Sequence, residues 1–289
     1  MTDATEVTAR PRSDSALRGR LLPWISLALL CAAIAPTVGW LWYRWTLGIW
    51  YNAHGLLIPF IVAYLVYQDL RDDPDSGVRA SPWGFLFLVP SLLLLALDSA
   101  IGTQLLSAIA LVTCLPGLSL LLLGTERTKR LIFPLIIAAL MLPIPAGFIA
   151  PLHLQLREIS AWGAWNVVPL FGIPIMLEGT FLHLPRNVLL VADACSGFST
   201  LYAAVTTALI LAHWSHSRAK KFVVIVSAII LSVICNIARV TTMALLIHYR
   251  GADLLKTPLH EISGLATFIV TLALLFAIGG RGVLWGSKP

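Results

Sequence analysis

Three side chains in the C-terminal half of the sequence carry the parts of acyl-transfer chemistry: a thiol, a guanidinium and an imidazole. Cys195 could supply a nucleophile, Arg239 a cation for a developing oxyanion, and His260 a general acid and base. Each of them lies inside or at the edge of a long apolar run. Their chemistry therefore depends on helices that bring them to one side of a membrane.

Arg239 is the strongest single signal, because it lies inside the apolar run 230–247, about 13 Å along the helix from the end of its span. A charged side chain in a span almost always faces a protein interior or an aqueous cavity. A functional site and a structural ion pair with a carboxylate are equally good interpretations of this residue. The carboxylates that could form the pair are Asp98, Asp193 and Glu261. Asn236 lies three residues earlier on the same helix face and could orient the guanidinium.

Cys195 lies where a long connection meets the next apolar run, in the segment 191–200. The free N–H groups and the dipole at the start of a helix favour a thiolate over a thiol. Gly197 leaves room beside the sulfur, and Ser196 offers a hydroxyl for capping or hydrogen bonding. Composition alone favours a simpler interpretation, an inert small residue at a helix start. The other cysteines, none in a metal-ligand spacing, are Cys31, Cys114 and Cys235.

His260 opens the last apolar run and is followed by Glu261. Histidine is the usual proton donor and acceptor near neutral pH, so this position could supply a general acid and base. An interfacial histidine without a role is the alternative. The histidines that this alternative describes adequately are His153, His183 and His248. His54, which precedes an early apolar run, is expected on the same side of the membrane and is a rival for the same role.

The composition shows that a membrane must position these residues. Of the 289 residues, 58% are hydrophobic and only 12% are charged, whereas an ordinary soluble domain has about 25% charged residues. A soluble globule and a disordered chain are both excluded, and long unbroken apolar runs argue against an outer-membrane barrel. We predict an all-α polytopic bundle of about eight transmembrane helices. The expected spans are 21–43, 53–69, 82–98, 100–124, 131–149, 197–215, 222–248 and 259–279.

The basic residues predict the orientation of this bundle, because Lys and Arg gather on the cytoplasmic side of membranes. With a cytoplasmic tail at 1–20, fourteen of the 20 Lys and Arg residues fall in cytoplasmic segments. Those expected outside are Arg44, Arg157, Arg186, Arg250 and Lys256. The tail 281–289 is then also cytoplasmic, and 21–280 forms one transmembrane domain. The net charge of +6 sets this topology and does not indicate a nucleic-acid partner.

The expected topology brings the three chemical side chains together. Cys195 begins the sixth span at the outer face, Arg239 lies in the outer half of the seventh, and His260 begins the eighth. Three consecutive helices can pack so that these positions converge. One long connection, 150–196, precedes the sixth span and combines amphipathic pieces with an extended-looking stretch, 181–192. A long connection in a compact protein is more often functional than idle.

The order of these motifs resembles that of the exosortases, within the exosortase and archaeosortase group. The matching segments are Ala194–Gly197 after an acidic residue, Asn236–Val240, His260 before the final span, and His54–Pro59 before an early apolar run. The likeness covers residues 21–279 approximately. Two positions depart from the family pattern, since Asp193 stands where Glu is expected and Ser199 stands where Arg is frequent.

The resemblance implies a multi-pass cysteine transpeptidase or protease in the bacterial inner membrane, with its site on the periplasmic side. Its partners would be the lipid bilayer and membrane-anchored proteins whose C-terminal sorting signals combine a Pro-Glu-Pro-type motif, a transmembrane helix and a basic tail. Cys195 would be the nucleophile, Arg239 the cation for oxyanion or substrate, and His260 the general acid and base. The residues expected to bind substrate or support these three are Asp193, Ser196, Gly197, Asn236, Glu261 and His54. Neither a metal nor an organic cofactor is expected.

A transporter that binds an anionic substrate through Arg239 is the alternative from another functional class. A transport site should lie near the midplane of the membrane, and many transporters consist of repeated halves. The sequence shows no internal repeat, and all three candidate residues lie toward one side of the expected bundle. A third interpretation, a structural subunit of a membrane complex, would make Cys195 dispensable.

Overall fold

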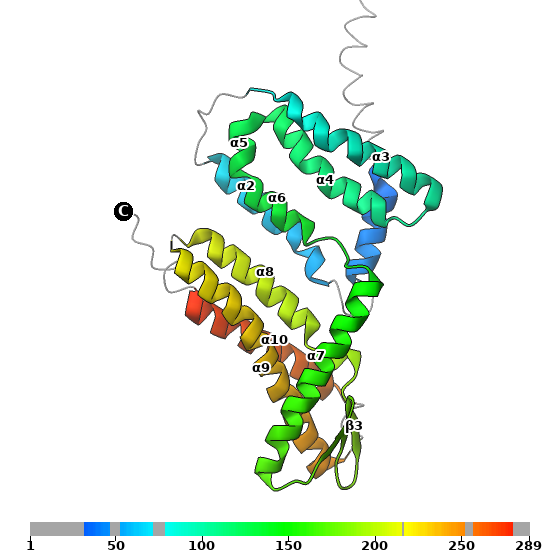
Figure 1. Cartoon of the computed structure of the whole chain (residues 1–289), viewed down its shortest axis with the longest axis vertical. Helices are drawn as coiled ribbons and strands as arrows, with labels where there is room; N and C mark the ends of the chain where they lie inside the picture. Colours follow the sequence, from blue (N-terminus) through cyan, green and yellow to red (C-terminus); the bar gives the residue numbers. More distant parts are fainter. Residues whose placement is uncertain (1–31, 47–52, 72–78, 216, 252–256, 280–289) are drawn as a thin grey trace, which may run out of the picture.

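The computed structural model describes residues 32–46, 53–71, 79–215, 217–251 and 257–279. The chain is almost entirely helical, as the sequence predicts, with one small sheet (Figure 1). The first described helix covers residues 32–46 and overlaps the first expected span. The tails expected at 1–20 and 281–289, together with Cys31, lie outside the described residues.

The N-terminal helices form one packed group (Figure 1). Helix α2 (Ile58–Arg71) packs against α6 (Ile132–Ala139), while α3 (Phe85–Ile101) and α4 (Leu105–Leu122) pack against each other. Short 3-10 turns precede α2 and α3, namely η1 (Ala53–Leu56) and η2 (Pro82–Gly84). The buried apolar residues at the centre of the group are Leu41, Ile58, Ala108, Val112, Ile137 and Met141.

A buried carboxylate closes the α3–α4 hairpin. Asp98 is 1% exposed, and its Oδ1 accepts hydrogen bonds from the backbone N–H and the hydroxyl of Thr103. Its Oδ2 accepts hydrogen bonds from the backbone N–H and the hydroxyl of Ser107, in the first turn of α4. Both oxygens are therefore used within the hairpin, where they satisfy helix-end donors. Asp98 consequently does not serve as an ion-pair partner of Arg239.

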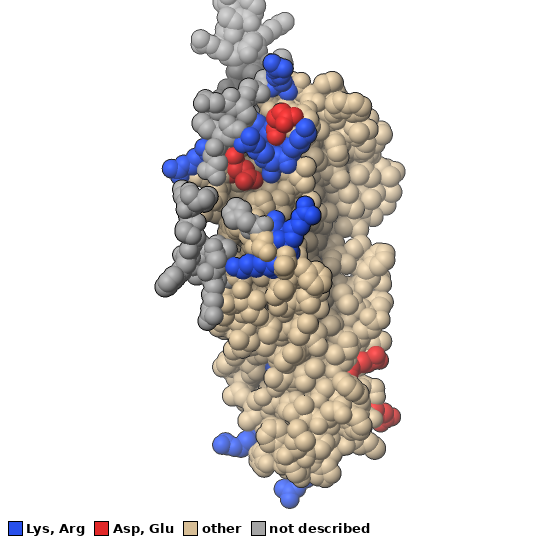
Figure 2. All heavy atoms as spheres, turned by 60° about the vertical axis from the view of Figure 1, so that its left-hand side comes forward, with Lys and Arg blue, Asp and Glu red and all other residues tan. Residues whose placement is uncertain are grey.

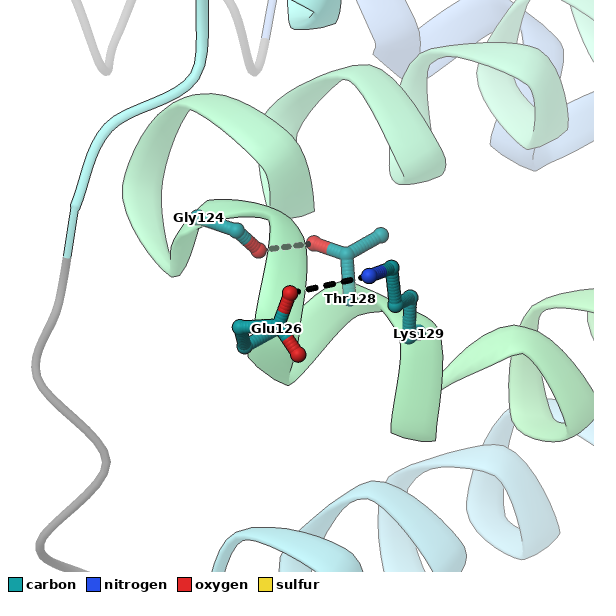
Figure 3. A network of polar contacts seen from close by, with 4 residues as sticks. All are labelled: Gly124, Glu126, Thr128 and Lys129. Atoms are coloured by element: carbon teal, nitrogen blue, oxygen red, sulfur yellow. Dashed lines mark hydrogen bonds and ion pairs between the residues drawn. The ribbon is translucent and has the colours of Figure 1, made fainter.

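A short charged helix, α5 (Gly124–Arg130), turns the chain between α4 and α6 (Figure 3). Within it, Lys129 Nζ lies 2.9 Å from Glu126 Oε1, and the Thr128 hydroxyl donates to the Gly124 carbonyl at 2.8 Å. Gly124 has a φ of +82°, and a Cβ there would clash with the backbone carbonyl oxygen of Arg79. Only glycine fits this turn without strain.

Basic side chains mark one part of the surface. Figure 2 shows Lys and Arg gathered in the upper half of the visible face, next to a broad surface without charged residues. Helix α5 and the first turn of α9 (Arg218–Arg250) carry basic residues that the sequence places in the cytoplasm. They are Arg127, Lys129, Arg130, Arg218, Lys220 and Lys221. Basic clusters beside large uncharged surfaces are typical of multi-pass membrane proteins.

The segment expected as the span 131–149 is not a single helix. Helix α6 ends at Ala139, residues 140–145 are not helical, and a new helix, α7 (Ala146–Val167), continues into the expected outer connection. Pro143 and Pro145 lie in the break, where proline removes backbone donors and disfavours helical conformation in the preceding residue. Hydropathy does not reveal this break, because the residues on both sides of it are apolar.

The second part of the expected outer connection forms a small antiparallel sheet. Its strands are β1 (Met176–Glu178), β2 (Phe181–His183) and β3 (Val188–Leu190), in the order β1-β2-β3. Leu182 and Leu189 lie opposite each other across β2 and β3, and both are buried. The stretch 181–192, expected to be extended, therefore contains two of the three strands.

The C-terminal helices carry the candidate residues. A 3-10 turn, η4 (Asp193–Cys195), leads into α8 (Phe198–Trp214), and α8, α9 and α10 (Leu259–Gly279) each pack against the other two (Figure 1). Helix α7 packs across α9. The buried residues between α7, the sheet and the C-terminal end of α9 include Ala161, Ala164, Leu182, Leu189, Val240, Met243 and Ile247.

Among the described residues, five helical segments are long and apolar enough to cross a membrane. They are Pro82–Ile101, Leu105–Leu122, Asp193–Trp214, Arg218–Arg250 and Glu261–Gly279. Each corresponds to one of the expected spans. The prediction of a polytopic all-α membrane protein is thus confirmed, while the count of eight spans and the side of the termini stay predictions.

Candidate active site

Cys195 ends the 3-10 turn η4, three residues before the first residue of α8. Its backbone N–H donates to the Ala192 carbonyl at 2.8 Å, and the residue is 7% exposed. Cys195 borders a cavity of about 210 Å³ between β3 and α9. The residues that line this cavity are Leu189, Leu190, Val191, Ala192, Cys195, Arg239, Val240 and Met243. The cavity therefore brings the candidate thiol and the candidate cation to one space.

Gly197 and Asn236 fix the turn that carries the thiol. Gly197 has a φ of +77°, and a Cβ there would lie 2.6 Å from Asn236 Cγ, so the close approach of α9 requires glycine. Asn236 is 2% exposed, and its Nδ2 donates to the Cys195 carbonyl at 2.8 Å and to the Ser160 hydroxyl at 2.7 Å. Asn236 thus holds the backbone of the turn η4 through the Cys195 carbonyl.

The Arg239 side chain connects α9 to α10 and to the turn η4. Its Nε donates to the Ser263 hydroxyl of α10 at 3.1 Å, and its Nη1 donates to the Ala194 carbonyl at 3.2 Å. A Cβ at Gly264 would lie 3.2 Å from Nη2, so α10 approaches the guanidinium closely at this position. The guanidinium is therefore held in a defined orientation beside the residue that precedes Cys195.

The three carboxylates that the sequence offers as structural partners of Arg239 lie on three different elements. Asp98 belongs to the α3–α4 hairpin, and Asp193 Oδ1 lies 2.9 Å from Arg157 Nη1. Glu261 is exposed on the first turn of α10. The contacts described for the Arg239 guanidinium are with the Ser263 hydroxyl and the Ala194 carbonyl.

The length of α9 changes the expected depth of Arg239. A helix of 33 residues is about 50 Å long, whereas the hydrocarbon core of a bilayer is about 30 Å thick. The C-terminal turns of α9, which contain Val240, Met243 and Ile247, are buried against α7 and the sheet. The apolar side chains of these turns therefore contact protein. Arg239 lies at the start of this protein-covered segment, where a charged side chain costs less free energy than it does in contact with lipid.

His153 in α7 is a residue to which the sequence assigns no role. It is 3% exposed, its Nδ1 lies 3.0 Å from the Ser196 hydroxyl, and its ring centroid lies 4.7 Å from that of Phe198. Burial lowers the pKa of His153 from its ordinary value, so the ring is neutral at pH 7. His153 therefore contacts the residue directly after the candidate nucleophile.

One face of α7 contacts Asp193, Ser196 and Asn236. Arg157 lies four residues after His153 and pairs with Asp193, and Ser160 accepts a hydrogen bond from Asn236. The α7 cradle, as we call His153, Arg157 and Ser160, follows the i, i+4, i+7 spacing of one helix face. That spacing is the signal in the sequence that could have identified these residues, had the segment been considered a helix.

The two candidate histidines lie on different elements, of which only α10 is described in contact with Arg239. The backbone of His260 lies in the first turn of α10, one turn before Ser263 and Gly264. The turn η1, which contains His54, packs against α8. The side chains of both histidines lie outside the described part of the structure. Within the described residues, no group of three or more His, Cys, Asp or Glu could hold a metal ion.

One family model matches most of the chain. The model described as transmembrane exosortase matches residues 42–277, which is more than half of the chain and includes Cys195 and Arg239. No curated protein and no solved structure matches the chain significantly.

Proposed function

The chain belongs to the transmembrane exosortase family, a family of membrane-embedded sorting proteases and transpeptidases, and we propose that it uses Cys195 to cleave the C-terminal sorting signals of membrane-anchored proteins. The observation that carries this proposal is the cavity shared by Cys195 and Arg239, which come from different elements and meet beside the first turn of α10. We place this cavity at the periplasmic face of the inner membrane. The substrate signal would combine a Pro-Glu-Pro-type motif with a transmembrane helix and a basic tail.

The proposed reaction has two steps. In the first, His260 takes the proton of the Cys195 thiol, and the sulfur attacks the scissile carbonyl carbon. Arg239 stabilises the oxyanion, the C–N bond breaks, and His260 gives the proton to the leaving amine. In the second, an amine, hydroxyl or water attacks the thioester and releases the thiol. Every chemical group that these two reaction steps need belongs to the chain, to the substrate or to the acceptor.

Reconstitution of the full chain into liposomes tests the proposal. A membrane-anchored protein with a C-terminal sorting signal, added during reconstitution, is expected to lose its C-terminal segment, as measured by mass spectrometry. A matched substrate with the signal motif scrambled should stay intact. A preparation that leaves both substrates intact but takes up an anionic solute would contradict the proposal and favour the transporter.

A comparison of two histidine variants assigns the acid–base role. We expect His260→Ala to lower the processing rate by about 10²- to 10⁴-fold, the range for loss of a general acid or base. His54→Ala should keep the rate within about threefold, because its turn η1 packs against α8, whereas His260 lies on α10, the helix that contacts Arg239. The measurement is the initial rate of C-terminal processing at equal protein levels. The reverse ranking would transfer the acid–base role to His54.

The α7 cradle predicts a positioning role for His153. We expect His153→Leu to lower the processing rate by about tenfold, because Ser196 loses a buried hydrogen-bond partner. His153→Asn should restore most of the rate, since an amide can hydrogen-bond to Ser196 from a similar position. A residue needed only to fill volume would give the opposite result, with leucine better than asparagine. Thermal unfolding in detergent, measured for both variants, separates a positioning effect from loss of the fold.

A further inference from the structure

Strand β3 forms one edge of the three-stranded sheet. The Val191 N–H donates to the Thr180 carbonyl, and the Leu184 N–H donates to the Asn187 carbonyl. In an antiparallel ladder, hydrogen-bonded pairs alternate, so Leu189 directs its backbone groups toward β2.

The backbone groups of Val188 and Leu190 must then point to the other side, away from β2. Among the described residues, no hydrogen bond from another element reaches these groups. The side chains of Val188 and Leu190 are 50% and 44% exposed, whereas Leu189 between them is buried. The outer edge of β3 is therefore a row of available donors and acceptors.

This edge leads directly into the cavity that contains the candidate nucleophile. Leu189 and Leu190 line the cavity together with Cys195 and Arg239. Buried apolar side chains anchor β3 to α9, and the Asn187 side chain donates to the Ile247 carbonyl at 3.3 Å. The edge and the thiol therefore belong to one rigid surface, so a chain bound along β3 would have a fixed register relative to Cys195.

An extended peptide is the occupant whose chemistry fits both features. A strand added to a sheet edge pairs its backbone with the edge, while alternate side chains enter adjoining pockets. The mostly apolar cavity would take such a side chain, and Arg239 would meet the carbonyl of the peptide or an acidic side chain. A lipid chain could fill the cavity, but it offers no alternating donors and acceptors for β3.

We propose that the outer edge of β3 binds the peptide segment around the scissile bond as a fourth strand of the sheet. This inference rests on the proposed function, because it supplies the binding mode of the same substrate. It assigns the recognition of the peptide backbone to Val188 and Leu190. Their side chains and the cavity would then select residues at alternate positions of the substrate.

Site-specific photo-cross-linking tests this binding mode in the full chain. A photoreactive amino acid would replace Val188 on β3 or, as a matched control, Met176, which is 60% exposed on the opposite edge strand. Both would be made in the Cys195→Ala background, with a substrate that the wild-type chain processes in a parallel sample. We expect the yield of cross-linked substrate to be about tenfold higher from position 188.

A second pair of variants tests the backbone contact itself. Leu190→Pro removes the outward N–H but none of the ladder hydrogen bonds, and proline is tolerated on edge strands. Leu190→Ala removes the side chain and keeps the N–H. We expect processing by the proline variant to be about tenfold slower than by the alanine variant, the effect of one lost hydrogen bond. Equal thermal unfolding of the two variants would show that the sheet is intact.

The outcomes separate this inference from the proposed function. Equal or higher cross-linking from Met176 would overturn the binding mode while wild-type processing still supports the protease. Indistinguishable rates for the two Leu190 variants would also overturn it. Absence of processing by the wild-type chain would instead contradict the proposed function, and with it the premise of a peptide substrate.

Discussion

Replacement of Cys195 by alanine is expected to abolish C-terminal processing, with a loss in rate of at least about 10³-fold. Alanine keeps a small apolar side chain in a site that is 7% exposed, and the hydrogen bonds that fix the turn involve the backbone of Cys195. The fold should therefore survive while the sulfur is lost. The measurement is the amount of processed product formed from a co-expressed substrate with a C-terminal sorting signal.

Cys235 provides the matched control for this experiment. It lies on α9, directly before Asn236, and is half-buried. Because it does not line the shared cavity, Cys235→Ala should process substrate at a rate within about twofold of the wild type. Normal processing by Cys195→Ala would show that the thiol is dispensable, as expected for a structural subunit of a membrane complex.

Arg239→Lys is expected to keep the positive charge but to lose about 10²-fold in kcat/KM. The guanidinium donates in two directions at once, from Nε to Ser263 and from Nη1 to the Ala194 carbonyl. The single ammonium of lysine does not reproduce this planar fork, so both the orientation of the cation and its link to the nucleophile turn should be lost.

The same exchange at the end of α9 controls for a general effect of lysine. Arg250 lies on the same helix, is exposed, and does not line the cavity. Arg250→Lys should therefore leave kcat/KM unchanged within about twofold. If Arg239→Lys retains near-normal processing, Arg239 acts only as a generic cation, and the proposed role in oxyanion binding is wrong.

Many of the long helices could be predicted from the sequence, because a helix that crosses the bilayer needs an apolar segment of about 20 residues. The two runs that form the α3–α4 hairpin and the three that form α8, α9 and α10 are long and uninterrupted. The prediction of a single span at 131–149 was wrong, because Pro143 and Pro145 divide this apolar run into a short helix and the start of α7. Prolines inside transmembrane helices are common, so their presence alone did not predict a break.

The chemical core of the site could be predicted, but its support could not. Cys195 and Arg239 stand out as a thiol at a helix start and a charge in an apolar run, and the structure places both on one cavity. The spacing of His153 and Arg157 indicates a shared helix face, but their partners could not be predicted, because α7 packs against η4 across about 40 residues of sequence. The contact of Asn236 with the Cys195 carbonyl could not be predicted either, because it depends on the close approach of α9 that Gly197 allows.

Trapping of the acyl-enzyme shows whether Cys195 is the nucleophile. The full chain in liposomes would be mixed with substrate, denatured in acid without reductant, digested, and examined by mass spectrometry. We expect a thioester between Cys195 and the new C-terminus of the substrate, which hydroxylamine cleaves and which Cys235→Ala retains. Processing without such an adduct, or with the adduct on another residue, would contradict the assignment of Cys195 as the nucleophile.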